Sequence, residues 1–520
     1  MPTFLPCSHW LALFACLLLA PMSASAQFDP YSAMTGIDAF SNNGSCMPCQ
    51  QAAGEAEFVN SLYSTSGYGD FEASCGCDDN SLMTMGPYDD SSYLMPYQPQ
   101  FHSQPYDDGS CSIAPDSCHY PAPTGFPSTC DPYNSYSPGG YGNGICGSQT
   151  ICPCGNASPI WFGAEALIWN TSSSSLPLLV TTSDAGTQQF DAGVVGRPAT
   201  RNLYGGNSIF DGMHGGFRLR GGLNYDQCGI SGMDAEFFMI GTRLESYHAD
   251  STGDPILARP FFNAASGLDD ALLVAFPDLA SGTIDIVTRS RLNSVAWHYR
   301  EVFWKDCNPG DACPDNCWQS GPSSFSLGFQ IGPRFVNLRE SFGVNERLTS
   351  IDTGNQFQID DSFRTKNQFW GGEIGLFGTR QRRRWSLDGG VRLAIGGTNQ
   401  KLAVSGQTTV VSDVTTTSPG GFLAQRTNSG SWERNHFTLL PQFDVGIGYQ
   451  MTNTWRASVG YSLLYWGNVL RATEQIEPVV NPGLFPPEQN PLTGDLRPAT
   501  LLHDSGYLAH GITIGLEKRW

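Results

Sequence analysis

The chain closes on Tyr507-Leu508-Ala509-His510-Gly511-Ile512-Thr513-Ile514-Gly515-Leu516-Glu517-Lys518-Arg519-Trp520. The even positions from Leu508 to Leu516 are apolar except for His510, whereas the odd positions from Gly511 to Arg519 are small or polar. Side chains that alternate in this way lie on opposite faces of a strand. The stretch therefore predicts a β-strand with one apolar face and one polar face, ending on an aromatic residue.

The same two-residue period recurs from Pro159 onward, and it predicts about twelve strands. Each run is about ten residues long, which is enough for a tilted strand to cross a membrane, and many runs have Trp or Tyr near an end. The predicted strands are 161–169, 217–225, 233–239, 284–286, 295–300, 324–335, 342–348, 370–376, 385–395, 437–449, 455–465 and 508–520.

Two all-β folds share this period. In a soluble sandwich the apolar face meets a core, and in a membrane barrel it meets lipid. The aromatic strand ends and the final Trp520, which resembles the C-terminal insertion signal of outer-membrane barrels, favour the barrel. Lys518 departs from that signal. Because lipid forbids open sheet edges, we expect a closed, antiparallel, up-and-down transmembrane barrel.

Loop lengths test the number of strands, because outer-membrane barrels alternate short periplasmic turns with long outer loops. We interpret the link near Asn293 as a short turn and 397–432 as one long outer loop. In that interpretation 401–412 looks like a strand but does not cross the membrane. This gives twelve strands, or fourteen if 176–182 hides a further one.

Composition and charge narrow the class of protein. The chain has 520 residues, 59 Gly, 12% aromatic and 15% charged residues, and a formal net charge of −20. Such an acidic balance argues against nucleic-acid binding. Residues 1–26 read as a secretory signal that ends on Ala24-Ser25-Ala26, with a lipoprotein box around Cys16 as a weaker alternative. We therefore predict export to the cell outer membrane.

The region 27–158 differs in composition from the rest of the chain. It is rich in Tyr, Pro, Ser, Gly and Asp, lacks a sustained period and cannot build an apolar core. Its cysteines, and three more near residue 310, favour disulfides in an exported chain over zinc ligands or a redox pair. The disulfide candidates are Cys46, Cys49, Cys75, Cys77, Cys111, Cys118, Cys130, Cys146, Cys152, Cys154, Cys307, Cys313 and Cys317.

Charged residues on the polar faces are the candidate site. Facing a lumen, they would either set ion selectivity in an open pore or pair with one another and plug a closed one. His298 and His436 fall on the same faces as polar lining. Asp269-Asp270 is interpreted as a solvated turn in preference to a calcium site. The predicted lumen residues are Glu165, Arg218, Arg220, Asp234, Glu236, Arg300, Arg334, Glu373, Asp388, Arg392, Asp444 and Arg456.

Five stretches together resemble a β-barrel porin family of planctomycete bacteria, the seventh of the numbered families of this kind. The resemblance covers about 161–520 and implies an outer-membrane barrel, with no known reaction or ligand residue. The stretches are 162–169 (FGAEALIW), 215–222 (GGFRLRGG), 258–263 (ARPFFN), 361–372 (DSFRTKNQFWGG) and 460–466 (GYSLLYW).

Two functions follow from these observations. The first is a porin-like barrel that admits small polar solutes or ions by passive diffusion. The second is a structural or surface-interaction protein with a narrow or plugged lumen. An enzyme is third, since the sequence has no Gly-x-Ser-x-Gly elbow and its His residues are scattered. The expected partners are outer-membrane lipid, the barrel-assembly machinery and cell-wall material bound through 27–158, without a cofactor or metal.

Overall fold

The computed structural model describes residues 61–62, 157–307 and 323–520, which all belong to one compact unit, Glu55–Trp520. The predictions for the signal sequence, for the Cys-rich region and for Cys313 and Cys317 lie outside the described residues. Within the described part of the chain, no helix is both long and apolar enough to span a membrane.

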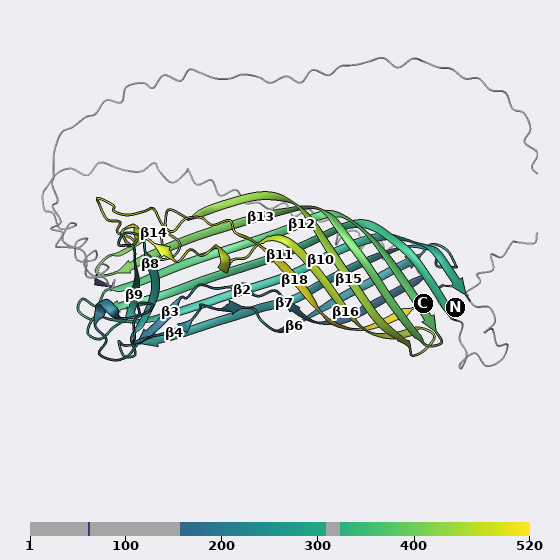
Figure 1. The fold of residues 1–520 in the computed structure, drawn as a ribbon, viewed down its shortest axis with the longest axis horizontal. Helices are drawn as coiled ribbons and strands as arrows, with labels where there is room; N and C mark the ends of the chain where they lie inside the picture. Colours follow the sequence, from purple (N-terminus) through teal and green to yellow (C-terminus); the bar gives the residue numbers. More distant parts are fainter. Residues whose placement is uncertain (1–60, 63–156, 308–322) are drawn as a thin grey trace, which may run out of the picture. The chain divides into compact units, whose positions relative to one another are not determined.

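Ten antiparallel strands form one large sheet whose path returns on itself (Figure 1). Their order is β12-β11-β10-β7-β6-β1-β18-β16-β15-β13, and β13 pairs in turn with β12, so that each strand has two hydrogen-bonded neighbours. The ring strands are β1 (Ile160–Thr171), β6 (Met213–Asn224), β7 (Ser231–Ser251), β10 (Ala280–Cys307), β11 (Ser324–Ser350), β12 (Gln356–Arg382), β13 (Trp385–Val411), β15 (Gly430–Gln450), β16 (Trp455–Leu470) and β18 (Asp504–Arg519).

The predicted number of strands, twelve or fourteen, is wrong for the described residues, because two pairs of predicted strands are single long strands. The runs 284–286 and 295–300 both belong to β10, and 324–335 and 342–348 both belong to β11. No turn lies near Asn293, which pairs with Asn337 in the ladder between β10 and β11. Likewise, 401–411 is neither a loop nor a separate crossing, since it is the second half of β13.

A change of polarity midway along the strands explains the error. On β10, Ile284 and Ile286 are fully buried and face the interior, whereas Val295 and Trp297 are exposed on the opposite face. The apolar residues thus move from even to odd positions within one continuous strand. On β11 the outward residues change from Phe325, Leu327, Phe329, Ile331 and Phe335 to Arg339, Ser341, Asn345, Arg347 and Thr349.

The apolar face of the sheet is therefore different at the two ends of the strands. Near the short turns at 225–230, 383–384 and 451–454, the outward side is apolar and the inward side polar. Toward the other, long-loop end, the outward side is polar and the inward side forms an apolar core with the connecting segments. We call the outward apolar side chains near the short turns the apolar belt.

Connections at the long-loop end are themselves folded. A five-stranded sheet, with strand order β17-β8-β3-β4 and β9 paired to β8, contributes to the apolar core of this end. The expected extra strand within 176–182 overlaps β3 of this small sheet and is not in the ring. The short elements are β2 (Ser174–Ser175), β3 (Val180–Ser183), η1 (Gln189–Asp191), β4 (Thr200–Tyr204), β5 (Ser208–Ile209), β8 (Leu257–Asn263), β9 (Leu268–Ala275), β14 (Thr415–Pro419), η3 (Thr473–Gln475), β17 (Val479–Val480) and η4 (Pro482–Leu484).

Asp269-Asp270 lies in β9 and not in a solvated turn. Asp270 is fully buried, and its carboxylate accepts hydrogen bonds from the Asn263 side chain at 2.9 Å and the Ala271 backbone N–H at 2.8 Å. Asp269 is exposed, because neighbours in a strand point to opposite faces. The two carboxylates therefore do not converge on one cation.

Buried charges attach the connecting segments to the ring. Glu340 of β11 accepts hydrogen bonds from the Arg471 guanidinium at 3.0 Å, the Ala472 backbone N–H at 3.2 Å and the Ser290 hydroxyl at 2.8 Å. Asp361 of β12 accepts the backbone N–H groups of the segment after β14. A buried charge without a partner costs several kcal/mol, so these contacts fix the connecting segments in place.

Asp226 closes the short turn between β6 and β7. Its carboxylate accepts the backbone N–H groups of Ile230 at 2.9 Å and Ser231 at 2.7 Å. Partial burial raises the pKa of Asp226, but these hydrogen bonds outweigh it and the net pKa is lowered. The ionised carboxylate is therefore the form that stabilises the turn.

Candidate functional site

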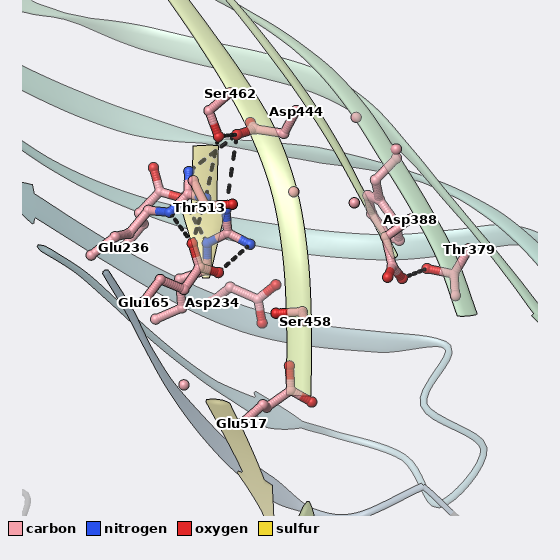
Figure 2. A pocket seen from close by; sticks show the side chains of 18 of the residues that line it. Glu165, Asp234, Glu236, Thr379, Asp388, Asp444, Ser458, Ser462, Thr513 and Glu517 are labelled. Carbon is pink, nitrogen blue, oxygen red and sulfur yellow. Dashed lines mark hydrogen bonds and ion pairs between the residues drawn. The ribbon is translucent and has the colours of Figure 1, made fainter. Parts of the chain in front are cut away.

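The twelve charged residues predicted for the polar faces come together inside the ring. Nine of them line a single cavity of about 250 Å³ near the short turns (Figure 2). Of the other three, Arg300 pairs with Asp234 of that lining and Glu373 pairs with Arg392 of that lining, whereas Arg334 pairs with Glu373. The alternation of the sequence thus places all twelve on the inward face, although it gives no information on which residues pair.

Two ion pairs span the ring. Arg392 of β13 donates to Asp444 at 2.8 Å and to Glu236 of β7 at 3.2 Å, although β10, β11 and β12 separate β13 from β7 in the sheet. Arg218 of β6 donates to Glu165 at 2.6 Å and to Asp444 of β15 at 3.1 Å, across β1, β18 and β16. Side chains from opposite walls therefore meet in the middle of the ring.

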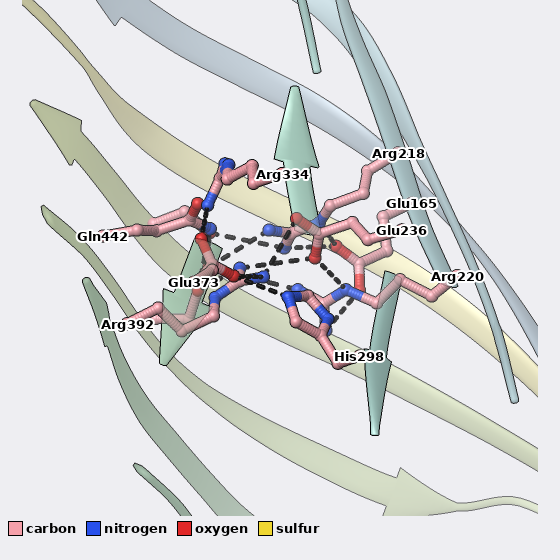
Figure 3. Close-up of polar contacts among 11 residues, drawn as sticks. Glu165, Arg218, Arg220, Glu236, His298, Arg334, Glu373, Arg392 and Gln442 are labelled. Atoms are coloured by element: carbon pink, nitrogen blue, oxygen red, sulfur yellow. Dashed lines mark hydrogen bonds and ion pairs between the residues drawn. The ribbon is translucent and has the colours of Figure 1, made fainter. Parts of the chain in front are cut away.

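Glu373 joins this network to a third wall (Figure 3). Its carboxylate accepts from Arg334, from His298 Nε2 at 2.7 Å and from Arg392 at 3.5 Å. Glu373 and Arg334 are almost completely buried. The ion-pair layer, as we call this network, consists of four arginines, four carboxylates and one histidine: Arg218, Arg220, Arg334, Arg392, Glu165, Glu236, Glu373, Asp444 and His298.

The remaining predicted residues lie closer to the short turns. Arg300 pairs with Asp234 at 3.0 Å, and Arg456 contacts both Asp388 and, at 3.6 Å, Glu517. Asp234 and Asp388 are more accessible than any carboxylate of the ion-pair layer, whereas Glu517 is about as accessible as Asp444. His436 also faces inward, but it lies on the far side of the layer and is not part of it.

An apolar layer lies directly beyond the ion pairs. It begins two residues further along the same strands, where Leu167 follows Glu165, Phe238 follows Glu236 and Ala394 follows Arg392. All fifteen of its residues are buried, and its two indoles are fully inaccessible. The members are Leu167, Trp169, Phe238, Ile240, Leu292, Val336, Leu338, Phe369, Ala394, Leu440, Leu464, Trp466, Val469, Tyr507 and Ala509.

The chemistry of the site follows from this arrangement. Positive and negative side chains alternate around the layer and form ion pairs with each other. Within the described residues, no group of three or more His, Cys, Asp or Glu is arranged to hold a metal ion. The ion-pair layer is thus suited to joining the walls of the ring.

Two features near the short turns were not predicted. Cys228 in the β6–β7 turn is disulfide-bonded, although it was not among the candidate cysteines. Lys518, the departure from the C-terminal signal, places its ammonium 4.8 Å from the centre of the Trp520 ring and 5.4 Å from that of Trp455. A cation over an aromatic face is favourable, which explains how a lysine is accommodated there.

Comparison with solved structures finds outer-membrane proteins at low similarity. The outer-membrane protease OmpT of Escherichia coli is 10% identical, with a TM-score of 0.33, and the match covers 70% of this chain and 97% of that one. The toluene transporter TodX of Pseudomonas putida is 9% identical, with a TM-score of 0.18 and coverage of 70% and 90%. These values carry no functional argument.

No curated protein matches the sequence. A family model does, over residues 161–520, and its description is "Putative beta barrel porin-7". The matched region contains all ten ring strands except the first residue of β1, and it confirms the family that the sequence motifs resemble. The chain therefore belongs to the beta barrel porin-7 family.

Proposed function

We propose that this protein is an outer-membrane β-barrel with a closed lumen, and that it serves as a structural or surface-interaction protein. The observation that carries the proposal is the ion-pair layer spanning the ring, backed by the buried apolar layer. Barrels of about eight strands are filled by side chains, and those of about sixteen leave a channel. A ring of ten strands lies near the filled end of this range.

Family membership and the dimensions of the apolar belt support the location. On β15 the outward apolar residues run from Phe437 to Tyr449, with Trp385 packed against Tyr449 at a ring-centre distance of 4.9 Å. The twelve residue-to-residue steps span about 40 Å of strand, or about 30 Å of height at a tilt of about 40°. This height matches the hydrocarbon thickness plus its aromatic edges.

Passive diffusion is the second candidate. The charged cavity of about 250 Å³ at the short-turn end supports it, because small polar solutes could enter such a space. To pass further, a solute would have to displace both the ion pairs and the apolar layer. We also propose that the barrel is not an enzyme. The His298 imidazole is buried against Glu373, and this carboxylate already binds two arginines.

Single-channel recording in planar bilayers separates the two candidates. We expect no current steps from the full chain, or from a variant that lacks residues 27–158, under conditions where an open porin of sixteen strands conducts. A carbonate wash of the same vesicles must leave the protein in the membrane, so that the lack of current does not reflect failed insertion. Regular current steps from the full chain would overturn the closed-lumen proposal.

A further inference from the structure

The outward side of β10 to β13 and of β15 carries polar residues in an ordered sequence just beyond the apolar belt. Residues that face each other across neighbouring strands are of one kind, and the kind changes every two residues along each strand. We name three such rows. The apolar row is Val295, Phe335, Trp370, Gly397 and Phe437; the amide row is Asn293, Asn337, Gln368, Asn399 and Asn435; the cation row is Arg291, Arg339, Lys366 and Lys401.

The spacing of the rows matches the layers of a membrane surface. Two residues of strand advance by about 6.6 Å, or about 5 Å in height at a tilt of about 40°. The amide row therefore lies about 5 Å, and the cation row about 10 Å, beyond the last apolar row. Polar headgroups occupy the outermost 5–8 Å or so of each leaflet. The amide row therefore lies within the headgroup layer and the cation row at its outer edge, from where long Arg and Lys side chains can bend back toward lipid phosphates.

Repulsion between its like charges makes the cation row destabilising by itself. Neighbouring strands are about 4.8 Å apart, and like charges directly opposite each other destabilise a sheet. Arg291 is paired in register with Arg339, Arg339 with Lys366, and Lys366 with Lys401. Arg289 and Arg364 add two exposed cations one row further out. This concentration of positive charge occurs in a chain with a net charge of −20.

Carboxylates of the protein neutralise only one end of the row. Lys401 pairs with Glu433 at 2.7 Å, and the Arg291 guanidinium contacts the Met239 sulfur at 3.0 Å. In the part of the chain that the structure describes, no carboxylate forms an ion pair with Arg339 or Lys366. Two adjacent cations at the centre of the row thus face outward without an anionic partner from the described residues.

We propose that the cation row binds the phosphate groups of anionic lipids in the leaflet at the long-loop end. Phosphates accept the guanidinium and ammonium donors. The amides below them bond to one another, Asn337 to Asn293 and Asn399 to Asn435, both at 2.9 Å. The inference needs the apolar belt to lie in lipid, but it does not depend on whether the lumen is closed. A conducting pore would leave it intact.

The test measures which lipids stay bound to the full chain. The protein is inserted into nanodiscs of phosphatidylcholine with graded phosphatidylglycerol, released into mild detergent and weighed by native mass spectrometry. The double variant Arg339→Gln and Lys366→Gln is compared with the charge-matched control Arg347→Gln and Arg201→Gln. Both control residues are outward or exposed cations away from the row. All proteins must keep their folded mobility on unheated gels.

We expect the unmodified chain to retain more phosphatidylglycerol than phosphatidylcholine. In the double variant this preference should decrease by roughly 30-fold, which is roughly fivefold for each cation removed. In the control variant it should decrease by less than about threefold. Inorganic phosphate alone should not raise the melting temperature. Equal retention of both lipids, equal losses in the two double variants, or protection by free phosphate as strong as by phosphatidylglycerol would each overturn the proposal.

Discussion

Replacing Arg392 with Ala should weaken the ring more than any single change at an exposed ion pair. The guanidinium contacts Asp444 at 2.8 Å, Glu236 at 3.2 Å and Glu373 at 3.5 Å, and its side chain is only 8% exposed. Removing it leaves buried carboxylates with fewer partners. Loss of one member of a buried ion pair costs about 3–5 kcal/mol, so we expect a decrease of that size in the free energy of unfolding.

The assay is urea unfolding of detergent-solubilised protein followed by tryptophan fluorescence. Arg426→Ala is the matched control, because Arg426 pairs with Glu488 at a similar distance of 2.7 Å but both side chains are more than 40% exposed. An exposed pair contributes about 0–1 kcal/mol. Arg392→Ala should also remain non-conducting, since the apolar layer still fills the lumen. If the two variants lost equal stability, the layer would not join the walls of the ring.

Three further predictions concern other parts of the fold. Ile374→Arg places a charge in the apolar belt and should cost about 2–4 kcal/mol of stability in a bilayer. Ser362→Arg, outward on the same strand but beyond the belt, should change stability by less than about 0.5 kcal/mol. Urea unfolding in vesicles measures both changes. Glu340→Gln should cost about 3–5 kcal/mol, because it removes the charge that holds Arg471, and hydrogen exchange should accelerate in the segment after β16. The pKa of Asp226 is lowered in the folded chain, so its stabilisation is present above the unfolded pKa and is lost as pH falls through the folded value. Amide exchange in the β6–β7 turn should therefore accelerate below about pH 4, and it should do so at all pH values in Asp226→Ala.

The sequence predicts the kind of fold because alternation is a local property. Every ring strand contains at least one predicted run, and every predicted lumen residue lies on the inward face. The predicted number of strands is wrong because strand lengths and turns are inferred from the apolar residues alone. Where the apolar residues change face, as between Ile286 and Val295 on β10, a continuous strand looks like two strands and a turn. Polar residues alone do not show on which side of a sheet water lies.

The ion pairs that span the ring could not be predicted in the same way. Whether Arg392 meets Glu236 depends on the order of strands around the ring, which brings residues 156 positions apart into contact. The sequence shows that both are inward-facing, but not that they reach each other. The cation row has the same origin, because Arg291, Arg339, Lys366 and Lys401 are far apart in the chain and meet only through register. None of these four residues lies in a predicted strand, so an alignment of those strands would not contain the row.

The reversal of polarity along β10 to β13 also determines which side chains an antibody to the long-loop end can reach. Beyond the amide row, β10 continues from Asn293 to Ala280, about 40 Å of strand at about 3.3 Å per residue. A binder approaching from outside meets a rigid wall on which only every second side chain is accessible. Antisera raised against linear peptides from these strands should fail on intact cells, whereas sera raised against the folded barrel should bind.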